Sequence, residues 1–424
     1  MMKKTCRLLL LFLLAVPGFA AEDDITFNEE EIALLTTFIS QPEPLPDPSN
    51  RYARDPKAIA FGKTLFFDKR LSEKGDMACS TCHDPAKGWG DGLEFPEGSL
   101  TQRNTPTILN AAYNRWFFWA GRADSLWSQA LQPMESPVEQ RFTRLELVHL
   151  LAGDANYKKQ YEAIFGALPD VSGLPKKGRP TGDADHSHDR AWRSLSQEDQ
   201  DAVNRVFGNI GKSLAAFEMG VHSRKSNFDV FVEGLKDKDP VKQKALSESA
   251  KLGLKIFLYK GRCNMCHLGP TFSDGEFHNI LVPRKDRQPT KDTGRYAGIK
   301  NLAADPFNSI GAYSDHPEKD QLMTGYLVAS QINWGQFRTP SLRDVARTAP
   351  YMHQGQFATL RDVIDYYSTL EDAVTPGGHN ETILIPLNLI EEEKQALIDF
   401  LTSLNSISDP RNFALNAGEK RSDP

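Results

Sequence analysis

The chain has 424 residues, a formal net charge of -6 at pH 7 and 5 cysteines. At roughly 150 residues per domain, this length predicts two or three domains. The charge is small for a chain of this size and leaves no basic footprint. Neither nucleic acid nor an anionic membrane surface is therefore expected as a partner.

Residues 1–21 predict a secretory signal peptide. A basic start is followed by the apolar run 8–16 and by small residues that end at Ala21. The apolar run is too short to span a bilayer, and no later stretch is long and apolar enough, so no membrane span is expected. Cys6 lies inside this segment, which leaves four cysteines in the mature chain.

The remaining cysteines all belong to two Cys-x-x-Cys-His motifs, at residues 79–83 and 263–267. This pattern is the attachment signature of c-type haem, in which two thiols bond to the porphyrin and the histidine ligates the iron. The alternative is a zinc or redox site with an accidental histidine, and two complete copies argue against it. Covalent haem assembly takes place in the bacterial periplasm, so that compartment is expected, and no disulfide is. Two covalent haems are predicted, held by Cys79, Cys82, His83, Cys263, Cys266 and His267.

Further matches around the two motifs predict an internal duplication. Each motif is preceded by a glycine with a bulky pair, and is followed by an aromatic residue, an Asp-Gly turn and a Thr-Pro step. Fourteen residues after the threonines of those steps stand Trp119 and His353. These matches indicate two related cytochrome-c-like halves. The other matched positions are Gly62 with Gly253, Phe66 with Phe257, Trp89 with Phe272, and Gly92 with Gly275.

The expected fold class is all-α, with two cytochrome-c-like haem domains, long loops and few or no strands. A run of alternating charges divides the chain into the expected domains 22–235 and 236–424. Residues 166–195 are rich in Pro, Gly and charge, which predicts a polar surface insertion. His186 and His188 in it could bind a metal, although a solvated loop is favoured. Apolar residues at helical spacing predict helices over 28–40, 142–165, 196–222, 241–258, 359–370 and 388–404.

The same fourteen-residue step predicts how the two irons differ. Fourteen residues beyond His353, in the second half, stands Tyr367. Fourteen residues beyond Trp119, in the first half, stands Pro133. Tyrosine can ligate iron as phenolate and proline cannot, so the first haem is predicted to be open and reactive and the second to be capped. Met134 and Tyr366 are the neighbours that a shift of register would bring to these positions. Tyr367 could instead be a buried residue of an amphipathic helix.

The motifs together resemble the bacterial di-haem cytochrome c peroxidase/MauG superfamily. Ordinary di-haem peroxidases have methionine where this chain has Tyr367, and those that are activated by reduction carry a distal histidine after the first haem motif. Residues 84–115 contain no histidine. Both departures place the chain nearer the MauG/MbnH branch, in which tyrosine occupies the second-haem position. Besides the haem motifs, the resemblance rests on Arg-Asn-Thr-Pro-Thr at 103–107, Trp-Ala-Gly-Arg at 119–122, Ser-Pro-Val-Glu at 136–139 and the segment 339–353.

The resemblance implies roles for individual residues. Glu139 corresponds to a distal glutamate that moves protons during peroxide cleavage, and Pro133 lies at the open side of the same haem. Trp119 corresponds to a tryptophan between the haems that relays oxidising equivalents. From composition alone, Glu139 could be a surface residue and Trp119 a packing residue. Calcium takes oxygen ligands that include backbone carbonyls, and an inter-haem calcium site is implied at Asn104, Thr348 and Pro350.

The function implied by the resemblance is that of a periplasmic enzyme that uses hydrogen peroxide to form a high-valent, bis-Fe(IV)-like state. Such an enzyme oxidatively modifies a partner protein, and tryptophan is the expected target. The alternative is a di-haem cytochrome c peroxidase that reduces hydrogen peroxide with electrons from a small cytochrome c or cupredoxin. A third reading, a di-haem electron carrier, requires both haems to be six-coordinate.

Overall fold

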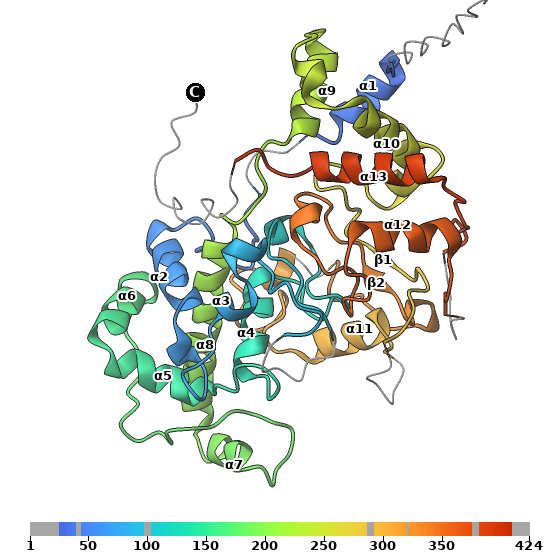
Figure 1. Ribbon diagram of the computed structural model, residues 1–424. Coiled ribbons are helices and arrows are strands. Elements are labelled where there is room, and N and C mark those ends of the chain that lie inside the picture. Colours follow the sequence, from blue (N-terminus) through green and yellow to red (C-terminus); the bar gives the residue numbers. More distant parts are fainter. Residues whose placement is uncertain are drawn as a thin grey trace, which may run out of the picture.

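The computed structural model describes residues 25–39, 44–96, 103–285, 292–319, 322–374 and 381–408, so the predicted signal peptide lies outside the described residues. These residues are mostly helix and loop (Figure 1). Within the described ranges the only strands, β1 (Phe277–His278) and β2 (Phe337–Arg338), pair antiparallel. The all-α expectation is confirmed. The helices are α1 (Glu29–Thr36), α2 (Pro56–Phe66), α3 (Cys79–Cys82), α4 (Leu126–Glu135), α5 (Arg144–Gly153), α6 (Ala155–Phe165), α7 (Ser187–Arg193), α8 (Gln197–Glu218), α9 (Asn227–Asp237), α10 (Glu248–Leu258), α11 (Arg295–Ala304), α12 (Leu360–Thr369) and α13 (Glu391–Ser403).

The first core is built around α8, which is buried on most of its second half. Gly62 of α2 allows these two helices to touch, because a Cβ atom at this position would lie 1.8 Å from the backbone oxygen of Ser213. Beside this crossing, the ring of Phe217 packs against Phe66 and Trp89, with centroids 5.1 and 6.4 Å away. The first haem motif therefore stands on a rigid helix pair.

The second core repeats this arrangement with α10 and α13. A Cβ atom at Gly253 of α10 would lie 1.9 Å from the backbone oxygen of Ala396 in α13. The ring of Phe400 packs against Phe257 and Phe272, with centroids 5.0 and 6.3 Å away. The matching glycines, crossings and aromatic trios give the predicted duplication a three-dimensional counterpart.

The loops that surround the two haem motifs are duplicated as well. In both halves a hydroxyl group fastens the loop: Thr107 donates to the backbone oxygen of Gly88 at 2.6 Å, and Ser341 donates to that of Thr271 at 2.7 Å. The same backbone positions adopt a positive φ in each half. These pairs are Trp89 and Phe272, Asn110 and Asp344, Phe118 and Met352, and Gly121 and Gly355.

The two cores do not follow one cut in the sequence. Leu35 of α1 and Phe228 of α9 pack in the second apolar cluster, although both precede the expected boundary at 235/236. Phe307, which follows that boundary, packs in the first cluster. The expected domains 22–235 and 236–424 therefore stay a prediction of which segments bind each haem. Each apolar core contains residues from both sides of that boundary.

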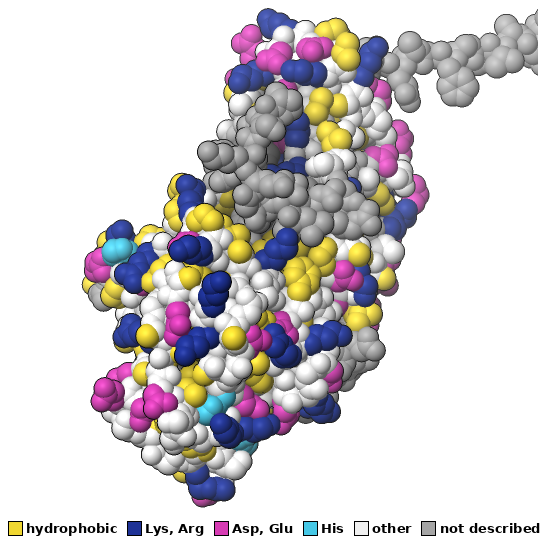
Figure 2. All heavy atoms as spheres, turned by 90° about the vertical axis from the view of Figure 1, so that its left-hand side faces the viewer, with side chains coloured by type: hydrophobic (Ala, Val, Ile, Leu, Met, Phe, Trp, Pro, Cys, Tyr) yellow, Lys and Arg dark blue, Asp and Glu magenta, His cyan; other side chains and the backbone are white. Residues whose placement is uncertain are grey.

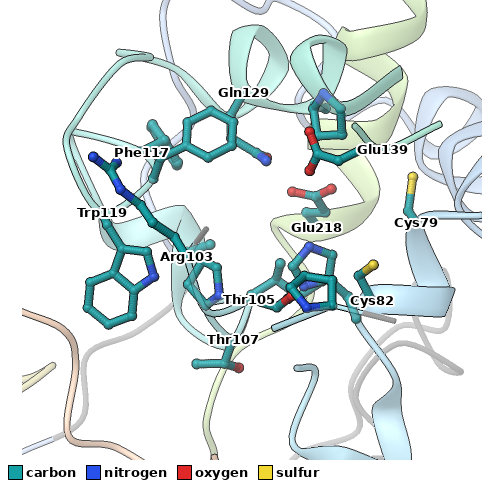
Figure 3. Close-up of a pocket in the computed structure, with 18 of the residues that line it drawn as sticks. Cys79, Cys82, Arg103, Thr105, Thr107, Phe117, Trp119, Gln129, Glu139 and Glu218 are labelled. Carbon is teal, nitrogen blue, oxygen red and sulfur yellow. The ribbon is translucent and has the colours of Figure 1, made fainter. Parts of the chain in front are cut away.

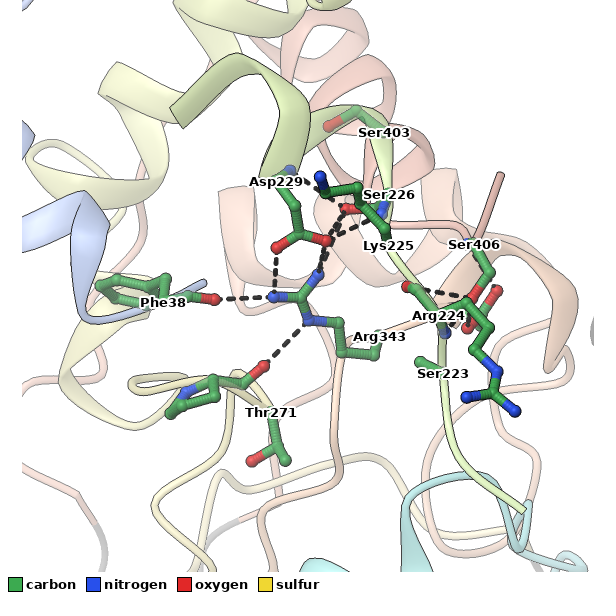
Figure 4. Close-up of polar contacts among 12 residues, drawn as sticks. Phe38, Ser223, Arg224, Lys225, Ser226, Asp229, Thr271, Arg343, Ser403 and Ser406 are labelled. Carbon is green, nitrogen blue, oxygen red and sulfur yellow. Dashed lines mark hydrogen bonds and ion pairs between the residues drawn. The ribbon is translucent and has the colours of Figure 1, made fainter. Parts of the chain in front are cut away.

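A buried ion pair fastens α1 and α9 to the second core (Figure 4). The guanidinium of Arg343 donates to both carboxylate oxygens of Asp229 at 2.7 and 2.8 Å, and the two side chains are 2% and 1% exposed. It also donates to the backbone oxygens of Phe38 at 2.6 Å and Pro270 at 2.9 Å. Every one of these partners comes from a different segment of the chain, so Arg343 holds the segments together.

Two of the predicted helices differ in the structure. The expected helix 142–165 is interrupted, because the side chain of Asp154 accepts from the backbone N–H groups of Asn156 and Tyr157 and starts α6 there. The expected helix 241–258 begins with a 3₁₀ turn, and α10 starts only after its cap Ser247. In both cases a local cap overrides the apolar spacing.

The insertion 166–195 is mainly loop and ends in α7. It is not wholly solvated, because Trp192 is buried. The ring Nδ1 of His186 accepts from the backbone N–H of His188 at 3.1 Å, so His186 caps α7. That bond gives Nδ1 of His186 a structural role at the start of α7.

The visible surface is mixed in charge. On the face drawn in Figure 2, basic and acidic side chains are interspersed with apolar ones. Across the part of the chain that the structure describes, no helix combines the length and apolarity needed to cross a membrane.

Candidate active site

The first haem motif faces a cavity between α3, α4 and α8 (Figure 3). The cavity encloses about 1190 Å³, part of which is open to solvent. Cys79, Cys82 and His83 line it, and neither cysteine forms a disulfide. The predicted residues Trp119, Pro133 and Glu139 line the same space. The structure thus brings together side chains that are widely separated in sequence.

Both motif histidines are held in one tautomer. Nδ1 of His83 donates to the backbone oxygen of Trp89 at 3.2 Å, and Nδ1 of His267 donates to that of Phe272 at 2.9 Å. Because Nδ1 carries the proton, Nε2 keeps its lone pair for a metal. Burial lowers the pKa of both imidazoles, which favours the neutral form that ligates iron.

The chemistry of the cavity fits a haem, which is an apolar ring with two carboxylates. Ile108 and Phe117 supply apolar lining, and Arg103, Arg122 and Arg338 supply positive charge. Burial lowers the pKa of Arg122 and Arg338 to about 10, so both remain cationic at neutral pH. Nε of Arg338 is buried and finds no hydrogen-bond partner among the described residues. A carboxylate in the cavity would satisfy it.

A tight turn after α4 places Glu139 at the cavity. The backbone N–H of Gln140 donates to the oxygen of Pro133 at 3.2 Å, and that of Phe142 donates to the oxygen of Met134 at 2.7 Å. The carboxyl group of Glu139 points into the cavity, above that of Glu218 (Figure 3). Pro133 lines the cavity, while Met134 is buried in the core. The place of Pro133 at the first haem stays a prediction.

Tyr367 projects from α12 towards the second haem motif. Burial raises the pKa of Tyr367, and Cys263 and Cys266 lie within electrostatic range of its phenol. Tyr366 is engaged elsewhere, because its hydroxyl donates to the backbone oxygen of Ile280 at 2.6 Å. Of the two neighbouring tyrosines, Tyr367 is the one beside the haem motif.

Cys266 also lies near an acidic pair and a histidine. The candidate ligand atoms of Cys266, Asp274 and His278 lie within 4.8 Å of one another. The ring nitrogens of His278 are bonded to Asp274 at 2.7 Å and to Glu381 at 2.9 Å. The hydrogen bond with Asp274 raises the pKa of His278 to about 11, so both nitrogens are protonated. A doubly protonated histidine has no lone pair for a metal, and this group is an ion-pair cluster.

Trp119 connects the rim of the first cavity to the second half. Its indole N–H donates to the backbone oxygen of Asn104 at 2.9 Å, and its own backbone oxygen accepts from Arg338 at 2.9 Å. The backbone N–H of Asn104 donates to the oxygen of His353 at 3.0 Å. The ring of His353 stacks on Phe337, with centroids 3.7 Å apart. Trp119 and His353, which the duplication matches, are therefore linked through a single residue.

The residues predicted to bind calcium have their donor groups occupied. The side-chain amide of Asn104 donates to the backbone oxygen of Leu93 at 2.7 Å, and the hydroxyl of Thr348 donates to that of Val345 at 3.1 Å. These bonds consume N–H and O–H groups and not the oxygen lone pairs that calcium requires. With Pro350, these residues stay a prediction for the calcium site.

Sequence comparison decides the family. Cytochrome-c peroxidase IdrP2 of Pseudomonas sp. (strain SCT) is 31% identical, covering 84% of this chain and 85% of that protein. Methylamine utilization protein MauG of Methylophilus methylotrophus is 32% identical, covering 86% of this chain and 87% of that protein. The profile of the di-haem cytochrome c peroxidase family matches residues 56–237. The chain belongs to the di-haem cytochrome c peroxidase family.

Solved structures agree with this assignment. A MauG-like protein associated with microbial copper homeostasis superposes with a TM-score of 0.60 at 25% identity, covering 87% of this chain and 96% of that chain. The diheme peroxidase BthA from Burkholderia thailandensis superposes with a TM-score of 0.62 at 21% identity, covering 87% and 94%, and shows the fold. The protein is thus a di-haem peroxidase-like oxidoreductase, and its family implies two c-type haems.

The sequence did not single out some residues that line the cavity. Gln129 stands four residues before Pro133 on α4, so its place on the same helix face could have been inferred once Pro133 was assigned. Arg338 reaches the first cavity from β2 in the other half, and no sequence spacing reveals such a contact. Glu218 ends α8 at a position that helical periodicity assigns to the core.

Proposed function

We propose that this di-haem enzyme is exported to the periplasm, reacts with hydrogen peroxide at the haem of His83, and oxidises tryptophan of a partner protein. The two haems supply peroxide activation and the storage of oxidising equivalents. The chain supplies a proton-transfer group, a route between the haems and a difference between the two iron sites.

The difference between the sites is the observation that carries the proposal. Pro133 lines the first cavity and has no side-chain group that could ligate iron. Tyr367 stands at the matching step of the second half, close to Cys263 and Cys266. We infer that the iron bound by His83 would have no second protein ligand, and that His267 and Tyr367 would together hold the second iron. An anionic phenolate favours high oxidation states, which suits storage of oxidising power over acceptance of electrons from a high-potential donor.

Glu139 is the proton-transfer group in this proposal. Its carboxylate oxygen accepts a proton from hydrogen peroxide and returns one to the departing oxygen, which leaves as water. Glu139 and Arg122 line the same cavity, and the charge of Glu139 offsets part of the fall that burial causes in the pKa of Arg122.

Trp119 is the relay between the haems. Its indole lies at the cavity rim, and its N–H is fixed on Asn104, which also bonds to His353. The oxygen-rich surroundings of Asn104, Thr348 and Pro350 are proposed as the calcium site that keeps this junction rigid. Rigid placement reduces the reorganisation needed when an indole ring is transiently oxidised.

Peroxide scavenging is the second candidate, and the names of relatives favour it. Cytochrome-c peroxidases IdrP2 and IdrP1 of Pseudomonas sp. (strain SCT) match this chain at 31% and 30% identity, as strongly as the MauG proteins do. In that case a small cytochrome c or cupredoxin would supply electrons, and no protein would be modified. A simple electron carrier fits less well, because Pro133 leaves the first iron without a second protein ligand.

One experiment separates the two candidates. The purified di-haem protein is mixed with hydrogen peroxide and the proteins encoded beside it, and tryptophan masses are followed by mass spectrometry. A parallel assay follows steady-state oxidation of a reduced small cytochrome c and a reduced cupredoxin. We expect a tryptophan mass change with the parent, little donor turnover, and loss of the mass change in Tyr367→Met. Rapid donor turnover with unmodified tryptophans would establish the scavenger instead.

A further inference from the structure

Glu218 is a buried carboxyl group in the wall of the first haem cavity, and none of the roles above uses it. It is the last residue of α8 and is 4% exposed. Its side chain points into the cavity below Glu139 (Figure 3). Its Oε2 is buried and has no hydrogen-bond partner among the described residues. Burying a carboxyl oxygen without a hydrogen bond lowers the stability of the folded state, so a residue of this kind is expected to have a functional role.

The duplication shows that the fold does not need an acid at this place. Gly62 packs against the backbone of Ser213 in α8, and Gly253 packs against that of Ala396 in α13. Phe217 and Phe400, each four residues later, are the corresponding rings of the two aromatic trios. In that register Glu218 corresponds to Leu401, which is buried in the second core. The same helix position is therefore apolar at one haem and acidic at the other.

The electrostatic surroundings of Glu218 are set by burial. Burial raises its pKa to about 8, and no charged neighbour contributes. The other titratable or charged groups that line the cavity are Cys79, Cys82, His83, Arg103, Arg122, Glu139 and Arg338. His222 follows Glu218 in the chain. Of these groups, Cys79 lies within electrostatic range of Glu218, and it carries no charge once it is bonded to a haem. A new positive charge in the cavity would therefore be the dominant influence on the proton affinity of Glu218.

We propose that Glu218 is a redox-linked proton site of the first haem. When that iron would gain one electron from a reduced small cytochrome c or cupredoxin, a carboxylate oxygen of Glu218 takes one proton from solvent and an O–H bond forms. When the electron passes on to hydrogen peroxide, that O–H bond breaks and the proton returns to solvent. The physical cause is Coulombic, because the extra positive charge of the oxidised iron stabilises the carboxylate in a low-dielectric cavity. Linkage makes the effect reciprocal, so the ionised Glu218 lowers the midpoint potential of this haem. Leu401 cannot do this at the second haem.

The inference depends on the two haems that the family implies and not on the identity of the oxidised substrate. It therefore holds for a protein-modifying enzyme and for a scavenger alike. Failure of the tryptophan experiment would leave it intact, and its own failure would leave the proposed function intact.

The first test is redox-difference infrared spectroscopy of the di-haem protein in H₂O and D₂O. We expect reduction of the first haem to produce a carbonyl band of a protonated carboxylic acid that shifts in D₂O. Glu218→Gln keeps the shape of the side chain but cannot titrate, and Glu218→Leu copies Leu401, so both variants should lose the band. Glu139→Gln should retain it. A band that survives in both Glu218 variants, or no band in the parent, overturns the proposal.

The second test is potentiometric titration of both haems from about pH 6 to about pH 10, a range that brackets the pKa of Glu218. In the parent the potential of the first haem should fall as the pH rises, and the slope should be smaller in Glu218→Gln. The slope of the second haem should not change. An unchanged slope at the first haem contradicts the proposal. If both variants lose only the haem of His83, Glu218 serves haem retention and the proposal also fails.

Discussion

Tyr367 and Pro133 occupy the same place in two copies of one fold. Each lies fourteen residues after a member of the matched pair Trp119 and His353, and each stands on the helix that follows. Pro133 lines the cavity of the first haem motif, and Tyr367 lies close to the cysteines of the second. One duplicated architecture therefore carries a proline at the position that corresponds to a tyrosine in its other copy.

Replacement of Tyr367 by Phe tests this asymmetry. The parent, as isolated in the ferric state, should contain one high-spin and one low-spin haem, and Tyr367→Phe should perturb only the low-spin signal in EPR. Tyr366→Phe is the matched control, because it removes a hydrogen bond to Ile280 from the adjacent residue without removing a ligand. If Tyr367→Phe leaves both spectra as in the parent, the ligand assignment is wrong.

Glu139→Gln tests proton transfer in the first cavity. The variant should keep both haems but slow the reaction with peroxide by a factor on the order of 10²–10⁴, the usual contribution of general acid–base assistance. Stopped-flow absorption measures this rate. Glu162→Gln on α6, which lies outside the cavity, should react like the parent. A rate within a few-fold of the parent in Glu139→Gln would assign the proton transfer to another group.

The buried pair of Arg343 and Asp229 predicts a pH-dependent stability. Burial opposes ionisation of Asp229, but the charge and hydrogen bonds of Arg343 outweigh it and lower the pKa of the carboxyl group below its ordinary value. A lowered pKa stabilises the folded state fully above the unfolded pKa, and this contribution is lost as the pH falls through the folded pKa. Urea unfolding should therefore show stability falling below about pH 4.

Asp229→Asn should remove this pH dependence and cost about 3–5 kcal/mol at pH 7, because the charge of Arg343 stays buried without a partner. The partly exposed pair of Lys260 and Glu393 is the control. Glu393→Gln should change the free energy of unfolding by no more than about 1 kcal/mol. Equal effects of the two substitutions would contradict a specific role for the buried pair.

Local sequence was sufficient for the features that depend on spacing. The haem motifs, the matched loops and the register of Pro133 and Tyr367 are fixed by short distances along the chain, and the structure places the last two beside their respective haem motifs. The break in helix 142–165 could also have been predicted from the sequence. Gly153 disfavours continuation of a helix, and Asp154 is a residue type that caps the start of the next one.

Long-range packing was not accessible in this way. Phe228 of α9 and Leu35 of α1 join the second core although they stand far apart in sequence, and Arg343 bonds to segments that no periodicity connects. From the sequence alone, Glu218 is one polar residue within the expected helix 196–222. Only its burial, its orphaned oxygen and its alignment with Leu401 distinguish it.

Trp119→Phe tests the route between the haems. The substitution keeps an aromatic ring and loses the N–H bond to Asn104, which should cost about 0.5–1.5 kcal/mol of stability. Phenylalanine is much harder to oxidise than indole, so the variant should still react with peroxide at the first haem but fail to share the oxidising equivalents with the second. Trp116→Phe is the control, because Trp116 is a buried tryptophan that packs with Phe277 and Leu302 in a separate cluster and does not line the cavity. Mössbauer and EPR spectra after peroxide addition, with mass spectrometry of the partner, should show loss of sharing and product in Trp119→Phe alone. Unchanged sharing and unchanged product yield would remove Trp119 from the route, because its place at the rim would then reflect packing.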